Sequence, residues 1–429
     1  MPSPTAQEVE SSSQTAILWK GLTRNVLLLG LVSLLTDVSS EMSLTFLPFF
    51  LANVLGAKTA VIGLIEGVAD SAASLTRLLS GWLSDVWRVR KGLVVVGYAL
   101  SALSKPFLYV SNSWATVLGV RFADRVGKGI RTSPRDALLA ASAPLASRGL
   151  SFGFHRGADT AGAFLGLVGV ALIVYLSEGG APRLEAHTFR RLVLVAIIPA
   201  FLAVAALWRV KESSPQARLR RAGRQPGTPL SRRFKVFLLA AGLFSLANSS
   251  DAFLLLRTQD LGLSVFGIAL LLAGFNLTYT LVSTLSGSYS DRVGRPALIS
   301  AGWLVYALTY LGFALARSSW QVWPLFGLYA VYYGMAEGTA RALVADLVPD
   351  EQRGTAYGLY NTVVGLTALP ASLLAGLVWQ GIGGWAGWGP SAPFYLGAAF
   401  AGAAVMLFTW SMRGFLRLVV VAAAAQENP

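Results

Sequence analysis

One apolar stretch of the chain is dense in charged side chains: RFADRVGKGIRTSPRDALLAAS, residues 121–142. In a helix turning about 100° per residue, the cationic side chains of Arg121, Arg125, Lys128 and Arg135 form a stripe roughly 80° wide. Asp124 and Arg131 flank the stripe on one side, and Asp136 flanks it on the other. A helix with one charged face and one apolar face is typical of an element that lines a polar cavity.

Carboxylates that can oppose this stripe occur in other apolar stretches. Asp37 and Glu41 lie in one, and Asp70 shares a helical face with Glu66 and Arg77 in the next. Acids and bases are nearly balanced in number, which favours structural ion pairs. The alternative is contact with a bound ligand, and we favour it most for Asp37, Glu41, Arg125 and Lys128, with Arg131 also a candidate.

The second half of the chain holds fewer such residues. The segment NSSD, ending at Asp251, resembles VSSE, ending at Glu41. Glu337 and Arg341 have the i, i+4 spacing of a helical ion pair, which we expect to form and which can act as a switchable bridge. Four further residues fit either a cavity wall or ordinary helix packing, with packing favoured: Asn276, Tyr279, Tyr332 and Tyr333.

The composition is that of a membrane protein. Hydrophobic residues make up 54% of the chain, charged residues make up 13%, and the mean hydropathy is +0.58. Cysteine is absent and there are only two histidines, so we expect no disulfide, no metal site and no cofactor.

The net charge of +14 is concentrated in one segment rather than spread over a surface. Nine Lys or Arg residues and the single acid Glu212 lie between Arg209 and Lys235. This pattern indicates a cytoplasmic loop, with attraction to anionic lipid as a secondary effect, and no nucleic-acid partner.

Twelve apolar segments of spanning length predict an all-α membrane protein with two six-helix bundles. The segments are Asn25–Leu55, Ala60–Ser84, Leu93–Val110, Trp114–Ala143, Leu150–Leu176, Leu192–Trp208, Val236–Leu256, Val265–Tyr289, Ala297–Ala316, Val322–Leu347, Thr355–Trp379 and Phe394–Trp410. We expect a cytoplasmic lead-in (1–24), an N-terminal bundle (25–208), a basic linker (209–235), a C-terminal bundle (236–412) and a cytoplasmic tail (413–429). Lys and Arg in the short loops predict that both termini are cytoplasmic, and the lead-in does not resemble a cleavable signal peptide.

Two motifs each occur twice, and the two copies of each are separated by almost the same number of residues. This predicts that the chain is a duplication of one half, with the two halves in parallel orientation. GWLSD ends at Asp85 and GSYSD ends at Asp291, 206 residues later, where RVGR follows. SRGLSFG and QRGTAYG lie 205 residues apart, counted from Arg148 to Arg353.

In these motifs the chain resembles the major facilitator superfamily, whose loop after the second helix reads G-x-L-[AS]-D-R-x-G-R-[RK]. The matching residues are Gly81, Leu83, Ser84 and Asp85 in the first copy, and Gly287, Ser290, Asp291, Arg292, Gly294 and Arg295 in the second. The first copy departs after Asp85, and its basic end is Arg90 and Lys91. The resemblance implies a cytoplasmic gate formed by Gly81, Asp85, Arg90, Gly287, Asp291, Arg292 and Arg295; the alternative is that the arginines only anchor the loop inside.

The fourth helix also resembles the family, whose motif there is R-x-x-Q-G. Arg125 and Gly129 match it, and Lys128 takes the place of the glutamine. The string DRVGKGIRT is similar to that of a group of bacterial facilitator proteins. The family's antiporter signature in the fifth helix is only partly matched, by Gly162 and Gly166, which favours export mildly.

The resemblance implies a multi-pass secondary transporter of the inner (plasma) membrane that works by alternating access and is not an enzyme. The cationic stripe favours a small anionic or zwitterionic solute. No nucleotide-binding loop occurs, so we expect coupling to H⁺ through Asp37, Glu41 or Asp70, with Na⁺ coupling and uniport left open. We expect a monomer whose partners are the solute, the coupling ion and membrane lipid. The alternatives are a proton-antiport exporter of drugs or metabolites, a non-transporting sensor and an integral membrane enzyme.

Overall fold

The structure is a computed structural model that describes residues 22–87, 89–144, 147–179, 181, 183–212, 230–349 and 352–426. The predicted lead-in up to residue 21 and most of the basic linker, residues 213–229, lie outside these ranges. The described chain is almost entirely helical, as the sequence predicts.

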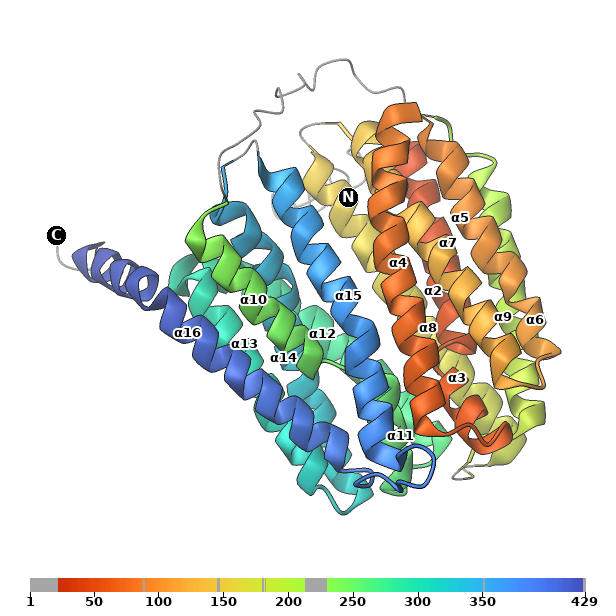
Figure 1. Cartoon of the computed structure of the whole chain (residues 1–429). Helices are drawn as coiled ribbons and strands as arrows, with labels where there is room; N and C mark the ends of the chain where they lie inside the picture. Colours follow the sequence, from red (N-terminus) through yellow and green to blue (C-terminus); the bar gives the residue numbers. More distant parts are fainter. Residues whose placement is uncertain are drawn as a thin grey trace, which may run out of the picture.

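Helices α2 to α9 gather on one side of the molecule and α10 to α16 on the other (Figure 1). The first group is α2 (Arg24–Ser43), α3 (Leu47–Phe49), the π-helix η1 (Phe50–Val54), α4 (Thr59–Trp87), α5 (Arg90–Ser104), α6 (Pro106–Tyr109), α7 (Trp114–Ser142), α8 (Arg148–Glu178) and α9 (Ala186–Leu207). The second group is α10 (Arg232–Ala247), α11 (Ala252–Asp260), α12 (Val265–Val293), α13 (Arg295–Leu315), the 3-10 helix η3 (Ser319–Gln321), α14 (Val322–Asp346), α15 (Arg353–Gln380) and α16 (Ala392–Gln426).

Within the described ranges, nine helical segments are long and apolar enough to cross a membrane. Helices α4, α7 and α14 have the length of a span but are not apolar enough to be among these nine. Nine plus these three correspond to the twelve predicted segments. Helix α16 continues to Gln426 and therefore includes most of the residues predicted to form a tail.

The seventh predicted segment is broken at Asn248–Asp251, between α10 and α11. Side chains from other helices satisfy the freed backbone groups. The Tyr306 hydroxyl donates to the carbonyl of Ala247 over 2.8 Å, and the Ser250 amide donates to the Ser372 hydroxyl over 3.1 Å. Broken helices inside a membrane protein are tolerated where protein or a cavity replaces lipid around the backbone.

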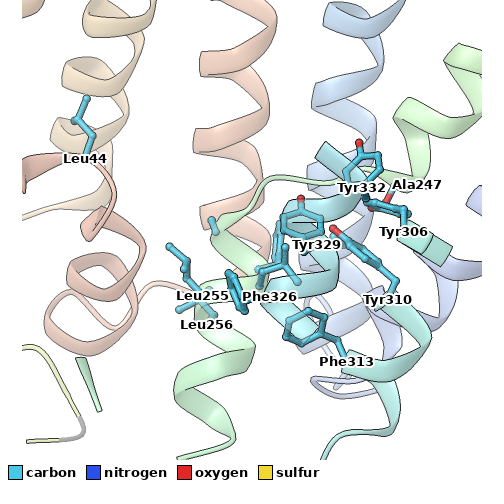
Figure 2. Packing of buried hydrophobic residues seen from close by; sticks show 14 of the residues in the cluster. Leu44, Ala247, Leu255, Leu256, Tyr306, Tyr310, Phe313, Phe326, Tyr329 and Tyr332 are labelled. Atoms are coloured by element: carbon cyan, nitrogen blue, oxygen red, sulfur yellow. The ribbon is translucent and has the colours of Figure 1, made fainter. Parts of the chain in front are cut away.

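Aromatic residues of α13 and α14 form much of the buried core around this break, as Figure 2 shows for Tyr306, Tyr310, Tyr329 and Tyr332. The rings of Tyr306 and Tyr310 stack with centroids 4.1 Å apart. Tyr306 meets Tyr332 edge to face at 4.8 Å. Such packing gives the break a rigid wall.

The two groups of helices meet along α4 and α15, which lie side by side (Figure 1). Glycines make the approach close: a Cβ on Gly63 would lie 2.2 Å from the Ser372 carbonyl oxygen, and one on Gly376 would lie 2.3 Å from the Thr59 carbonyl oxygen. The Thr59 hydroxyl donates to the Gly376 carbonyl over 2.9 Å. Close contact of this kind depends on small residues.

Candidate functional site

Two cavities lie between the groups of helices and meet at three charged residues, Asp37, Lys128 and Arg131. The narrow cavity has a volume of about 320 Å³ and is lined by α2, α4, α7, α12, α14 and the break before α11. The wide cavity has a volume of about 820 Å³ and extends toward the end of the molecule where Arg295 and Arg341 lie. The predicted cavity-lining role of the charged helix, α7, agrees with this arrangement.

Two of the α7 arginines form ion pairs with α4. Arg121 and Glu66 are both buried and joined by two hydrogen bonds of 3.1 and 2.6 Å. The Arg125 guanidinium lies 3.5 Å from the Asp70 carboxylate. Structural pairing therefore accounts for these two members of the predicted stripe, and for Asp70.

Arg131 turns toward α5 rather than into open space. Its guanidinium lies 4.4 Å from the centre of the Tyr98 ring and donates to the Ser101 hydroxyl over 2.7 Å. Only 6% of the residue is exposed, although it borders both cavities. Its position flanking the stripe in sequence explains this orientation.

Six charged groups at the narrow cavity have no ion-pair partner among the described residues: Asp124, Arg131 and the four that follow. The side chains of Asp37 and Lys128 have neither a hydrogen bond nor an ion pair within the described chain. Glu41 accepts a hydrogen bond of 2.6 Å from Thr45, and Asp251 accepts one of 2.6 Å from the Tyr329 hydroxyl. Asp37, Glu41, Lys128 and Asp251, all predicted as candidates, are brought to one site.

Aromatic side chains from the second group of helices form the wall opposite α7. Phe275, Phe326 and Tyr329 line the narrow cavity together with Asn276. The ring centroids of Phe275 and Tyr329 are 5.8 Å apart. Sequence reasoning missed Tyr329, although its spacing to Tyr332 and Tyr333 places the three on one side of a helix.

A chain of polar contacts crosses the wide cavity from one group of helices to the other. Arg156 of α8 donates to the Tyr279 hydroxyl of α12 over 2.8 Å, and that hydroxyl donates to Glu337 of α14 over 3.0 Å. Glu337 pairs with Arg341 at 3.3 Å, which confirms the predicted helical ion pair. Asp159, hydrogen-bonded to Ser33 of α2, lies 3.9 Å from Arg156. Tyr279 is thus a bridging residue, whereas packing was the favoured prediction.

The predicted gate can be followed only in part, because the side chains of Asp85, Asp291 and Arg292, and residue Gly287, lie outside the described side chains. Arg90 donates to the carbonyl of Ala137 over 3.2 Å. Arg295 donates to the carbonyl of Ala342 over 2.9 Å and pairs with Asp346. Gly81 packs against α7, where an added Cβ would lie 3.3 Å from that of Ser133.

A polytopic helical membrane protein with a charged cavity between two groups of helices is the class that this geometry defines. Comparison with known proteins identifies the family: the profile of the Major Facilitator Superfamily matches residues 29–257 and 236–417. The chain belongs to the Major Facilitator Superfamily and is an MFS-type transporter of a cell membrane, in agreement with the resemblance in its motifs. Members of this family are generally not enzymes.

Relatives agree with this assignment. The chain is 37% identical over 367 residues to an uncharacterised MFS-type transporter of Methanocaldococcus jannaschii, covering 84% of this chain and 89% of the relative. It is 26% identical over 366 residues to an uncharacterised protein of Mycobacterium tuberculosis, covering 83% and 87% of the two chains. Similarity to the quinolone resistance protein NorA of Staphylococcus aureus, at 26% identity, extends over 135 residues, 30% of this chain and 33% of NorA.

Solved structures share the fold at low identity. The nucleoside transporter NupG matches with a TM-score of 0.72 at 15% identity, over 91% of this chain and 99% of NupG. A bacterial homolog of the human lysosomal transporter Spinster matches with a TM-score of 0.67 at 17% identity, over 93% and 94% of the two chains.

Proposed function

We propose that the chain is a secondary active transporter that moves a small anionic or zwitterionic solute by alternating access, coupled to H⁺. The observation that carries this proposal is the Lys128 ammonium, which borders both cavities and has no ion-pair partner among the described residues. An uncompensated charge inside a membrane protein is costly and is retained where a solute or ion neutralises it.

The proposal includes two duplicated six-helix bundles with both termini in the cytoplasm, which rock against each other. Helices α4 and α12 each contain 29 residues, and their start positions differ by 206 residues. Arg90 and Arg295 are 205 residues apart and donate to Ala137 and Ala342, which are also 205 residues apart. Equal spacing of equivalent contacts supports a parallel repeat.

Coupling to H⁺ would be provided by Asp37 and Glu41, because neither is held by a cationic side chain of the described chain. Asp70, the third predicted coupling residue, is a weaker candidate because it lies in an ion pair with Arg125. Uptake of solute into proteoliposomes under an imposed pH gradient tests coupling. A rate that is independent of the gradient contradicts it.

Replacing Lys128 tests the solute site. We expect Lys128→Gln to lower the rate of solute uptake or efflux at least tenfold, because the anionic group of the solute loses its counter-charge. Lys58→Gln, just before the start of α4 and outside both cavities, is the control. Transport by Lys128→Gln at the rate of the unmodified protein would contradict the anionic site.

A second candidate function is a proton-antiport exporter of drugs or metabolites. The partial similarity to NorA, whose name describes quinolone resistance, favours this alternative over a sensor. It predicts that cells producing the protein tolerate higher concentrations of a toxic compound and that Asp37→Asn removes the tolerance. Unchanged tolerance across a panel of compounds argues for solute uptake instead.

A further inference from the structure

Acidic side chains outnumber basic ones in the narrow cavity, and basic side chains outnumber acidic ones in the wide cavity. Six carboxylates and four Lys or Arg side chains of the described chain line the narrow cavity. Four carboxylates and seven Lys or Arg side chains line the wide one. The cationic stripe of α7 therefore does not determine the net charge of the narrow cavity.

Ion pairing sharpens this difference. Glu66 and Asp70 are neutralised by Arg121 and Arg125, so the acidic excess of the narrow cavity belongs to other carboxylates. Three of them come from different elements: Asp37 and Glu41 from α2, and Asp251 from the break before α11. Their only hydrogen bonds within the described chain come from neutral hydroxyl groups, those of Thr45 and Tyr329.

The wall beside Asp251 is aromatic. Tyr329 holds the Asp251 carboxylate through its hydroxyl, and its ring lies beside that of Phe275. Phe326 completes this side of the cavity. Carboxylates together with ring faces attract organic cations, because the face of an aromatic ring carries negative potential.

We infer that the narrow cavity binds the cationic nitrogen of a zwitterionic solute with an apolar body. Asp251, Asp37 and Glu41 supply the counter-charge, Phe275 and Tyr329 supply the ring faces, and the anionic group of the solute lies toward Lys128. This inference rests on the proposed function for the anionic end and adds the cationic end. It excludes a simple anion as the preferred solute.

A matched set of probes separates the two charged groups. Tryptophan carries both, indole-3-propionate lacks the amine, and tryptamine lacks the carboxylate. Binding to the purified full chain is measured by isothermal titration calorimetry in detergent. We expect tryptophan to bind at least tenfold more tightly than indole-3-propionate, and tryptamine to bind measurably. Equal binding of tryptophan and indole-3-propionate overturns the inference, as does no binding of either amine at millimolar concentration.

Amino-acid substitutions test whether the preference for amine-bearing probes arises in the narrow cavity. Asp251→Asn should weaken binding of tryptophan and tryptamine at least tenfold and leave indole-3-propionate unaffected. Asp260→Asn, at the far end of α11 where Asp260 pairs with Arg257, is the matched control and should bind all probes normally. If Asp251→Asn does not fold, Glu41→Gln, which removes another carboxylate of the same cavity, replaces it with the same expected direction. Undiminished amine binding in the folded variant overturns the assignment.

The same probes distinguish this inference from the proposed function. Binding in detergent requires no gradient and no alternating access. Amine-dependent binding without uptake in proteoliposomes contradicts transport of the probe and leaves the site intact. Uptake of indole-3-propionate as fast as that of tryptophan supports transport and contradicts the cationic subsite.

Discussion

At the scale of residues, the charges of α7 divide into those that pair with a neighbouring helix and those that line the cavities without an ion-pair partner among the described residues. The Arg121–Glu66 pair is of the first kind: its two side chains are 6% and 4% exposed. Lys128 is of the second kind, since it borders both cavities without a partner among the residues described. The sequence predicted both kinds of residue but could not sort them, because the sorting depends on which neighbouring helix each side chain meets.

Breaking the buried pair gives a prediction about stability. We expect Glu66→Gln to destabilise the protein by about 3–5 kcal/mol, because Arg121 is left as a buried charge without compensation. The midpoint of thermal unfolding in detergent measures the effect. Asp70→Asn, in the longer and more exposed pair with Arg125, should cost much less. Equal losses in the two variants would show that burial of the pair is not the cause.

At the scale of elements, the apolar spans were predictable and the breaks within them were not. Hydrophobic length alone indicates where a span begins and ends, as for Ala297–Ala316 against the observed α13. The break at Asn248–Asp251 has no proline to signal it. It depends on Tyr306 and Ser372, which belong to helices far along the chain, so a local pattern cannot predict it.

The contact of α4 with α15 gives a prediction at this scale. Gly376→Ala should destabilise the contact by about 1–3 kcal/mol through overlap with the Thr59 carbonyl. A cysteine introduced by Asn53→Cys, in the cavity beside Gln380, reports this change. We expect maleimide to label it faster in the Gly376→Ala background than in the unmodified background. The natural chain has no cysteine to interfere. The control is Gly358→Ala on the same helix, whose added Cβ would lie 3.7 Å from the Leu78 side chain. Identical labelling rates in the two variants would exclude the glycine contact as a determinant.

At the scale of the whole molecule, the family and its fold were predictable from the short duplicated motifs together with the apolar segments, and the family profile covers most of the chain. The charge contrast between the cavities was not. Arg156, Tyr279 and Glu337 are separated by 123 and 58 residues, so only the folded arrangement brings them together.

The bridge through Tyr279 gives the last prediction. Tyr279→Phe removes the hydroxyl of α12 that joins Arg156 of α8 to Glu337 of α14. The loss of this hydrogen bonding, about 1 kcal/mol, should shift the equilibrium between contacting and separated α8 and α12 about fivefold toward the separated state. The labelling rate of a cysteine introduced by Thr132→Cys in the wide cavity reports the shift. Tyr175→Phe, where the ring packs on Phe266 with centroids 5.5 Å apart, is the control at the same pair of helices. A rate unchanged by Tyr279→Phe would show that the bridge does not hold the helices.

The opposite charge excess of the two cavities has a consequence for the membrane as a barrier. A small inorganic cation is repelled in the wide cavity, and a small inorganic anion is repelled in the narrow one, so each meets an unfavourable region on its way across. The zwitterionic solute that we propose would avoid this penalty by spanning the junction at Asp37 and Lys128. The arrangement proposed to accommodate such a solute would therefore also limit the leak of Na⁺ and Cl⁻ through the same path.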